Sequence, residues 1–549
     1  MNKLSGLNFI SIGGCFEIGM NLYAYIYDDK WILVDMGMGF DNTLGRELIV
    51  PSPEILIENK SKIQALFITH SHEDHIGAIP YLWPMIECPI YTRSFTIEMI
   101  KAKLGSFDLD RQVPLIKAGL NQPIKLEQFS VEFISVAHST PESSALAIHT
   151  PAGTVIHTGD WRIDREPVLG LQTDEERLKE LGDEGVLALV SDSTNAYREE
   201  QYGTEKEVRQ NLIDLVQNYK NKRILVTCFA SNVARIESCY EAAKASGRKL
   251  VAIGRSLKRI EKVAKAAGYF QDIPAFLDDR SLKDLDPAEV LMICTGSQGE
   301  MSSALTKIAN DAYKGITLGK DDVVIFSSRT IPGNEKAVLG IQNLLTEKGG
   351  QIITDLEYAI HASGHPTQPE LLHLYELVRP KVLIPIHGER IHLYKQAELA
   401  EKAKIETVLV PSDGDVINLS KDSAKVIDHY PVNMLAVDGV CLIPVDGDVY
   451  KAREKLSASG VVSLCVRLLK NSVKLEDIEF VGIFERDEQD AILEAKHDIE
   501  TEIKLSLENI LKGKTLDKTK ARDLIKKIVK TVLLKQRGKK PLVVVHIVE

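Results

Sequence analysis

The strongest constraint on this chain is the segment His70–His75, which reads H-S-H-E-D-H. It follows the apolar run Ala65–Ile68, which favours a buried strand that ends just before the histidines. Imidazole nitrogens and carboxylate oxygens are ligands that zinc prefers. A solvated polar loop is the alternative, but such a loop has no need of this pattern. The segment therefore predicts a strand and a loop that hold two divalent metal ions side by side.

Length and composition indicate a globular protein with several domains. A chain of 549 residues is too long for one hydrophobic core and predicts about three folded units. No apolar stretch approaches the roughly 20 residues of a membrane span, and the first residues lack signal-peptide character. The seven cysteines form no C-x-x-C pair, which favours reduced thiols. We therefore expect a cytoplasmic protein that does not associate with membranes.

Two patterns of secondary structure alternate along the chain. The N-terminal part favours strands, whereas the next part alternates helices and strands, as the βαβ units of a parallel sheet do. Strand ends that carry histidine then return, so the first domain is predicted to be interrupted by the second. The predicted limits are 1–195 and 351–420 for the split first domain, 196–350 for the inserted domain, 421–455 for a linker and 456–549 for a small α+β domain.

The net charge of −11 gives no general attraction to polyanions. An exception is the tail 501–549, which holds 13 Lys and Arg residues against 5 Asp and Glu residues. A local nucleic-acid contact and a solvated face of two amphipathic helices are both open interpretations of this tail. Strands of the same small domain are expected at 461–466, 479–484 and 542–548.

Three further strand ends carry residues that can complete a site for two metal ions. His138, Asp160 and His387 each follow an apolar strand and stand in or beside a turn of small residues. Two zinc ions need about seven protein ligands when one carboxylate bridges them. The predicted ligands are His70, His72 and His138 for one ion, Asp74, His75 and His387 for the other, and Asp160 between them. Asp35 is expected to orient a ligand without touching metal.

This ligand set resembles that of the metallo-β-lactamase superfamily over residues 1 to about 420, and the insertion resembles its nucleic-acid-processing β-CASP branch. Finer motifs are similar to those of the ribonuclease J family: T-C-F-A-S-N at 227–232, G-R-S at 254–256, T-G-S-Q-G-E at 295–300, H-A-S-G-H at 361–365 and I-P-I-H-G-E at 384–389. The resemblance implies an α/β fold, in which a metallo-β-lactamase αββα sandwich is interrupted by a parallel α/β β-CASP domain and followed by a small C-terminal α+β domain.

The resemblance also implies a function. It points to a 5′-to-3′ exonuclease on single-stranded RNA with a 5′ monophosphate, acting in rRNA processing and mRNA decay, and it allows internal cleavage. Two Zn²⁺ ions, with Mn²⁺ as the alternative, would hold the attacking hydroxide. Asp192 and His365 are expected as the catalytic pair that protonates the leaving 3′ oxygen. The residues expected to bind the substrate are Ser231, Asn232, Val233, His361, Ala362, Ser363, Gly364 and His365.

Three alternatives stay open: a small-molecule hydrolase on the same scaffold, a DNA-directed β-CASP nuclease, and a non-catalytic subunit of an RNA-decay assembly. The insertion of roughly 155 residues argues against the first alternative, because a small substrate does not need an additional domain beside the active site. The complete ligand set argues against the third. No residue separates RNA from DNA, since that requires a contact to the 2′-hydroxyl group. We also expect a homodimer or higher homo-oligomer, and partner proteins of an RNA-decay assembly.

Overall fold

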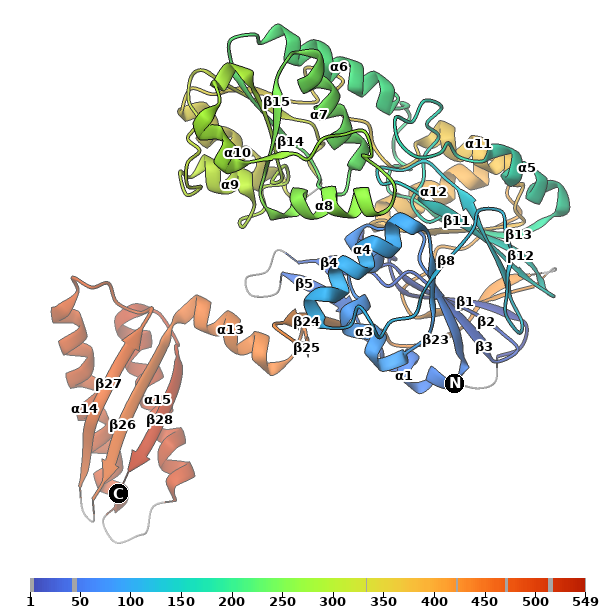
Figure 1. The fold of residues 1–549 in the computed structure, drawn as a ribbon. Coiled ribbons are helices and arrows are strands. Elements are labelled where there is room, and N and C mark those ends of the chain that lie inside the picture. Colours follow the sequence, from blue (N-terminus) through green and yellow to red (C-terminus); the bar gives the residue numbers. More distant parts are fainter. Residues whose placement is uncertain are drawn as a thin grey trace. The chain divides into compact units, whose positions relative to one another are not determined.

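A computed structural model describes residues 4–41, 47–331, 333–420, 423–469, 472–511 and 517–548 of the chain, and the side chains of 508–511 lie outside this description. The chain divides into two compact units (Figure 1). The first unit consists of residues 1–40 and 49–433, and the second of residues 41–48 and 434–549.

The first unit contains a sandwich of two large mixed sheets. One sheet has eight strands in the order β23-β22-β1-β2-β3-β6-β7-β8. Their bounds are β1 Leu7–Gly13, β2 Leu22–Tyr27, β3 Lys30–Val34, β6 Ile63–Phe67, β7 Ile90–Thr92, β8 Leu115–Lys117, β22 Asp415–Leu419 and β23 Ala424–His429. Strand β23 lies within residues 421–455, which the sequence analysis assigned to a linker, and pairs antiparallel with β22.

The second sheet has seven strands in the order β21-β20-β13-β12-β11-β10-β9. Their bounds are β9 Ile124–Lys125, β10 Ser130–Ser135, β11 Ser144–Thr150, β12 Gly153–His157, β13 Val186–Asp192, β20 Val382–Ile386 and β21 Thr407–Val408. The hairpin β11–β12 is antiparallel, whereas β12, β13 and β20 run parallel to one another. Strand β20 lies far along the chain from β13, so the chain leaves this sheet and later returns to it.

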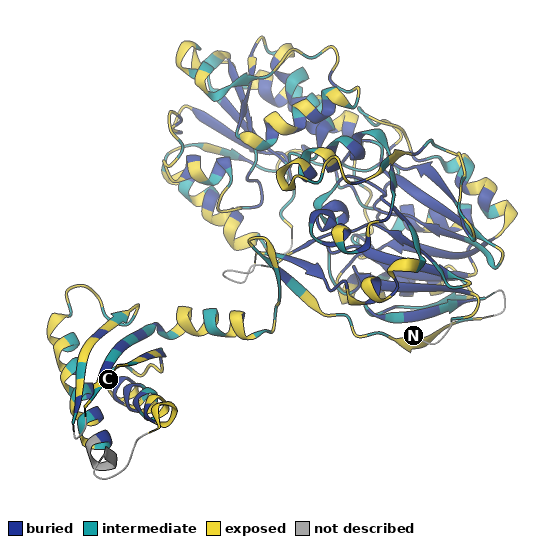
Figure 2. Cartoon of the chain, turned by 60° about the horizontal axis from the view of Figure 1, so that its bottom comes forward, coloured by how far each residue is buried: buried dark blue, intermediate teal, exposed yellow. Residues whose placement is uncertain are grey.

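Apolar side chains fill the space between the two sheets. Phe9 and Phe67 from the first sheet share a buried cluster with Phe133 and Val190 from the second. The other face of the second sheet packs against three helices, α5 (Glu175–Glu184), α11 (Gln368–Val378) and α12 (Arg390–Lys402). The helices α3 (Ile79–Ile86) and α4 (Ser94–Leu104) follow strands of the first sheet. Figure 2 shows the buried strands between more exposed helices. The predicted αββα sandwich is confirmed.

Between β13 and β20 the chain forms a third sheet of six strands, in the order β16-β15-β17-β14-β18-β19. All of its neighbouring strands run parallel. The strands are β14 Arg223–Thr227, β15 Lys249–Ile253, β16 Leu277–Asp278, β17 Val290–Cys294, β18 Asp322–Phe326 and β19 Gln351–Ile353. The helices are α6 Glu205–Asn218, α7 Val233–Ala245, α8 Arg255–Ala266, α9 Ala304–Ala309 and α10 Glu335–Glu347. The predicted parallel α/β insertion is therefore confirmed.

The second unit contains a small sheet in the order β27-β26-β28, with β26 at Val461–Leu468, β27 at Val473–Val481 and β28 at Leu542–Val548. The helices α14 (Gln489–Leu511) and α15 (Lys518–Arg537) pack on this sheet through an apolar cluster. This unit also contains the hairpin β24 (Met434–Asp438) and β25 (Cys441–Pro444) and the helix α13 (Asp448–Ser459). The predicted α+β domain is confirmed.

One strand of this domain was predicted with wrong bounds. The predicted strand spans 479–484, but β27 ends at Val481, and the next residue, Gly482, takes a left-handed backbone conformation (φ +69°). The strand begins earlier, because Val473 pairs with Leu468 and continues the register of β26. Lys474 and Glu476 are exposed on this strand, and their charges obscured the strand pattern in the sequence.

Among the described residues, no helix has the length and apolar character needed to cross a membrane.

A buried arginine, which is paired with Glu205 inside the insertion, joins the insertion to the chain that returns from it. Arg235 on α7 is fully buried, and its guanidinium donates to both carboxylate oxygens of Glu205 at 2.9 and 3.1 Å. The same group donates to the carbonyl oxygens of Ser327 and Ile360 at 2.8 and 2.9 Å. Arg235 therefore fixes the segment just before His361.

Replacing Arg235 with Met should destabilise the first unit strongly. The carboxylate of Glu205 would stay buried without its partner, which costs about 3–5 kcal/mol. Urea unfolding followed by circular dichroism measures this change. The matched control is Arg209→Met, which breaks the partly exposed pair with Glu237 and should cost about 1 kcal/mol or less. Equal losses in the two variants would contradict the special role of Arg235.

Candidate active site

The candidate site forms where strands of the two large sheets end close together. Because β13 pairs in parallel with both β12 and β20, the loops after these three strands emerge at one edge. Asp160 follows β12, Asp192 is the last residue of β13, and His387 follows β20. In the other sheet β6 ends at Phe67, and the segment 69–75 continues into the short helix α2 (Glu73–Ile76).

His70, His72, His138 and Asp160 form the first cluster of potential metal ligands. The Nδ1 atom of His72 lies 3.1 Å from Nε2 of His70 and 3.1 Å from Nε2 of His138. The Oδ2 atom of Asp160 lies 3.7 Å from each of those Nε2 atoms. Ligands that bind zinc tetrahedrally at about 2.1 Å stand about 3.4 Å apart. The four donor atoms therefore have the spacing that one ion requires.

Asp74, His75, Asp160 and His387 form the second cluster. The Nε2 atom of His75 lies 3.3 Å from Asp160 Oδ1 and 3.4 Å from Asp74 Oδ2. The Nε2 atom of His387 lies 3.3 Å from Asp160 Oδ2 and 3.7 Å from Asp74 Oδ2. Asp160 belongs to both clusters, and together the clusters contain all seven residues that the sequence analysis selected as ligands.

The chemistry of these clusters fits a pair of divalent metal ions. Within the described ranges, two of their buried atoms, Asp160 Oδ1 and His387 Nε2, have no hydrogen-bond partner. Leaving such atoms unpaired costs free energy unless a ligand satisfies them. The donors are five imidazoles and two carboxylates without a thiolate, a set that suits zinc and similar ions.

Hydrogen bonds from the far side of the rings orient the histidines. In three of them Nδ1 lies within hydrogen-bond distance of an oxygen atom that accepts its proton, so Nε2 faces the cluster and is the nitrogen that can bind a metal ion. These bonds run from His75 to Asp35 Oδ2 at 2.7 Å, from His138 to the carbonyl oxygen of Gly364 at 2.6 Å, and from His387 to Asn21 Oδ1 at 3.0 Å. Asn21 is a residue that the sequence analysis missed, because an isolated asparagine carries no recognisable signal.

Asp35 contacts the ring of His75 on the side away from the second cluster. It is fully buried just after β3, and its backbone is left-handed (φ +59°), which is unusual for a non-glycine residue. Besides His75, the backbone N–H of Thr69 donates to its carboxylate at 2.8 Å. Burial raises the pKa of Asp35, while His75 and Thr69 favour its ionised form. Asp35 thus holds both His75 and the start of the ligand loop.

Burial also keeps several of the candidate ligands in the protonation state that can bind metal. It lowers the pKa of His72 to about 4 and holds the pKa values of His70 and His138 well below the usual range. These imidazoles are therefore neutral at pH 7, as metal ligands must be. Burial opposes the charge of Asp160, but His387 and His75 outweigh it and hold the pKa of this carboxyl well below its ordinary value.

Asp192 and His365 lie in contact beside the second cluster. Asp192 Oδ2 lies 2.8 Å from Nδ1 of His365, and its Oδ1 accepts the backbone N–H of Thr194 at 2.8 Å. Nδ1 of His365 is also 3.9 Å from Asp160 Oδ2. Burial disfavours the charged imidazole, but Asp192, Asp160 and Asp74 outweigh it and raise the pKa of His365 to about 9. The pair can therefore hold a proton next to the candidate metal ligands.

Arginines surround the segment 361–364, and the sequence analysis did not select them. Arg162 donates to the carbonyl oxygen of Ser363 at 2.8 Å, and Arg235 donates to the carbonyl oxygen of Ile360. Burial lowers the pKa of His361 well below its usual range, and Arg235, Arg329 and Arg162 add to this effect. Isolated arginines resemble ordinary surface residues in a sequence, so only the fold shows that these three gather around one segment.

The segment 231–233 lies at the start of α7, and part of its hydrogen-bonding capacity is already used. The N–H of Asn232 donates to the carbonyl oxygen of Phe229 at 3.2 Å, and that of Val233 donates to the carbonyl oxygen of Ser231 at 3.0 Å. The side chain of Asn232 caps the helix by accepting the N–H of Arg235. Arg235 in turn reaches Ile360, so this helix start and the segment 361–364 are connected through one side chain.

Comparisons with known proteins agree with this fold and site. Four family models match: "Metallo-beta-lactamase superfamily" over 19–186, "Ribonuclease J, beta-CASP domain" over 221–345, "Zn-dependent metallo-hydrolase RNA specificity domain" over 349–411 and "Ribonuclease J C-terminal domain" over 449–549. A solved structure of a protein of unknown function from Enterococcus faecalis has a TM-score of 0.55 at 18% identity, covering 76% of this chain and 100% of its own. That similarity concerns the fold alone.

Several curated proteins match almost the whole chain. Ribonuclease J of Sinorhizobium meliloti is 39% identical, over 98% of this chain and 97% of its own length. Ribonuclease J 1 of Streptococcus pyogenes is 36% identical, over 92% of each chain. Ribonuclease J of Helicobacter pylori J99 is 31% identical, over 100% of this chain and 80% of its own length.

Fold and site together define a metallo-β-lactamase-type metallohydrolase with a β-CASP insertion. Within that class, the chain belongs to the ribonuclease J family. The resemblance that the sequence motifs indicated is therefore confirmed.

Replacing Gly364 with Ala should weaken metal binding. A β-carbon at this position would lie 2.5 Å from Cε1 and 2.6 Å from Nδ1 of His138, so the imidazole would have to move. Changes in the groups that orient a metal ligand typically cost about 10- to 100-fold in metal affinity. Zinc affinity measured by competition with a chelator tests this expectation. The control is Gly340→Ala, where a β-carbon meets open space; similar affinities for both variants would contradict it.

Proposed function

We propose that this chain is a zinc-dependent ribonuclease that removes nucleotides from the 5′ end of single-stranded RNA carrying a 5′ monophosphate, and that it also cleaves internally. The observation that carries the proposal is the pair of ligand clusters that share Asp160 beside the Asp192–His365 pair. Membership of the ribonuclease J family supports RNA as the substrate over a small molecule or DNA.

The residues proposed to hold the metal are His70, His72 and His138 for one ion and Asp74, His75 and His387 for the other, with Asp160 between them. Zinc is proposed as the native metal because nitrogen donors dominate the set. When bound, the ions would supply an activated water molecule and positive charge that offsets the charge on the reacting phosphate. Asp35, Asn21 and the carbonyl oxygen of Gly364 keep the imidazoles in the tautomer that binds metal.

The proposed role of His365 is to protonate the leaving 3′ oxygen. Its Nδ1–H donates to Asp192, so Nε2–H is the proton that the imidazolium can give away. Asp192 is itself fixed, because Thr194 N–H donates to its other oxygen. The backbone N–H of Asp192 donates to Thr158, two residues before Asp160. The acid is thus connected, through the Thr158 hydroxyl group and two residues of backbone, to Asp160, the carboxylate that is proposed to lie between the ions.

The proposed phosphate-binding residues are Ser231, Asn232, Val233, His361, Ala362, Ser363, Gly364 and His365. Burial lowers the pKa of His361, and the positive charges of Arg235, Arg329 and Arg162 add to this effect. Arg235 is paired with Glu205 and Arg162 lies 3.7 Å from Asp164, whereas Arg329 forms no ion pair among the described residues, so its charge favours an anion at this segment. Asn195 donates to Ser363 Oγ at 2.8 Å and so orders the hydroxyl group. A terminal phosphate held here would fix the 5′ end of the strand, which explains a 5′-to-3′ direction.

The predicted domain limits remain part of the proposal: 1–195 and 351–420, 196–350, 421–455 and 456–549, although β23 within 421–455 pairs in the first large sheet. We further propose that the enzyme acts in the cytoplasm in RNA maturation and decay, as a homodimer or higher homo-oligomer with partner proteins. Mn²⁺ is the proposed alternative metal.

The proposal predicts that RNA with a 5′ monophosphate is degraded faster than the same RNA with a 5′ triphosphate or a 5′ hydroxyl group. His72→Ala should abolish this activity because it removes a donor from the first cluster. The control is His149→Ala, at a half-buried histidine outside both clusters. Release of mononucleotides from labelled RNA is the measurement. Full activity of His72→Ala, or cleavage of a thioester without loss of RNA, would refute the proposal.

His365→Ala and Asp192→Asn should lower kcat by about 10²- to 10⁴-fold, the usual contribution of a general acid. Both variants should keep their bound metal. The defect should shrink on RNA with a sulfur atom in place of the bridging 3′ oxygen, because a thiolate leaves without a proton. The control is Glu175→Gln, which alters the His373–Glu175 pair elsewhere in the fold. A defect of the same size on both substrates would exclude the role in protonation.

A further inference from the structure

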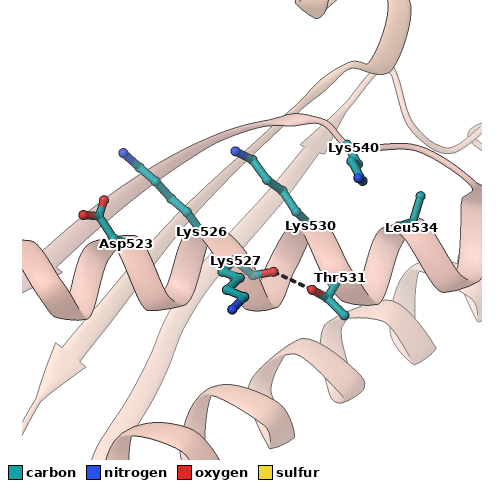
Figure 3. A pocket seen from close by; sticks show the side chains of 7 residues that line it. All are labelled: Asp523, Lys526, Lys527, Lys530, Thr531, Leu534 and Lys540. Carbon is teal, nitrogen blue, oxygen red and sulfur yellow. Dashed lines mark hydrogen bonds between the residues drawn. The ribbon is translucent and has the colours of Figure 1, made fainter.

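Lysines gather on one side of α15 in the second unit. A pocket of about 440 Å³ is lined there by Asp523, Lys526, Lys527, Lys530, Thr531, Leu534 and Lys540. Figure 3 shows Lys526 and Lys530 extending from the same side of the helix, with Lys540 reaching over from the segment that follows it. Lys527 points elsewhere, and its carbonyl oxygen accepts a hydrogen bond from Thr531. We call the site formed by Lys526, Lys530 and Lys540 the α15 lysine pocket.

These ammonium groups are not neutralised by the protein. In the part of the chain that the structure describes, Lys526, Lys530 and Lys540 form no ion pair, whereas Lys504 and Arg537 of the same unit pair with Glu500 and Glu488. Asp523 is the single acidic residue that lines the pocket. Partial burial lowers the pKa of Lys530, and the positive charges of Lys455, Lys526 and Lys540 lower it further.

The pocket is built on a rigid element. The opposite face of α15 packs into the core of the unit through Ile525, Val529 and Leu533, which are all fully buried. Lys526 and Lys530 stand four residues apart, so their β-carbons lie about 6 Å from each other on one helix face. Keeping like charges this close costs free energy in the free protein. An anion that bridges the lysines would remove that cost.

The shape and charge favour a flexible polyanion. A membrane-binding helix needs an exposed apolar face, but the apolar face of α15 is buried and Leu534, 42% exposed, is the large apolar side chain of this helix that reaches the surface. Lysine ammonium groups bind phosphates as point charges and read no base sequence. These properties suit the backbone of a single-stranded nucleic acid.

We propose that the α15 lysine pocket is a second RNA-binding site. It holds the phosphate backbone of the substrate independently of the residues around the two clusters of potential metal ligands. This inference rests on the proposed function, because that function makes RNA the polyanion in question. In this proposal, the basic tail 501–549 contacts two or three phosphates of the RNA.

The test compares two double variants of the full chain. Lys526→Gln/Lys530→Gln removes two charges from the pocket, and Lys520→Gln/Lys535→Gln removes two exposed charges of the same helix that do not line it. Both are made in the His72→Ala background, so that RNA stays intact during binding. Affinity for a 5′-monophosphorylated single-stranded RNA is measured by fluorescence anisotropy across a range of salt concentrations. Circular dichroism and the urea midpoint verify folding.

For single strands the slope of log affinity against log salt changes by about 0.7 for each phosphate contact. The slope of the pocket variant should therefore be smaller by about 1.4 than that of its parent. When the salt concentration falls from 1 M to 0.1 M, the affinity of the pocket variant should rise roughly 25-fold less than that of the parent. The control variant should keep the slope of its parent. When His72 is kept, so that the enzyme is active, neither double variant should alter the cleavage of a 5′-phosphorylated dinucleotide. Such a substrate is too short to place phosphates in the α15 lysine pocket as well as in the active site.

An unchanged slope in the pocket variant, or equal losses in both double variants, would overturn the inference. Loss of binding to phosphatidylserine vesicles or to inorganic triphosphate without loss of RNA binding would also overturn it, in favour of another anion. Failure of the wild type to cleave RNA would instead refute the proposed function, and lysine-dependent RNA binding in that case would still support the pocket.

Discussion

The carboxylate of Asp160 is the group on which the candidate site depends. It is 2% exposed, and it lies within 3.7 Å of a ring nitrogen from each of four histidines, His70, His75, His138 and His387. An ionised carboxylate buried at this depth needs positive charge close by. Two cations on its two sides would supply that charge and satisfy Oδ1, which has no hydrogen-bond partner in the described structure.

The sheets explain why these groups meet. β12, β13 and β20 are parallel neighbours, so side chains distant in sequence emerge at one edge. The insertion leaves the sandwich after β13 and returns before β20, so Asp192 lies just before it and His365 just after it. Their contact at 2.8 Å therefore requires the insertion to fold. Arg235 secures the returning segment, which couples the stability of the insertion to the geometry of the proposed acid.

Much of the fold could be predicted from the sequence because its signals are local. The strand β28 has the predicted bounds, since a run of β-branched apolar residues marks it clearly. The ligand loop was recognisable because it concentrates donors within six residues. The metal and substrate roles of the individual site residues remain predictions, although the structure brings the seven proposed ligands together.

Other features depend on contacts between distant segments and leave no local signal. Arg162 and Arg329 gather near His361 only after the insertion has folded. Asn21 reaches His387 across 366 positions of sequence. The N–H group of Val233 is used within its own turn, which depends on backbone geometry rather than on residue type. The strand β27 was misplaced because its exposed charges interrupt the apolar pattern.

Anomalous X-ray diffraction at the zinc absorption edge, from crystals of the active chain grown with Zn²⁺, tests the central claim most directly. The account predicts two peaks about 3.5–4 Å apart, one on each side of the Asp160 carboxylate. A single peak, or peaks away from Asp160 in fully active protein, would contradict it.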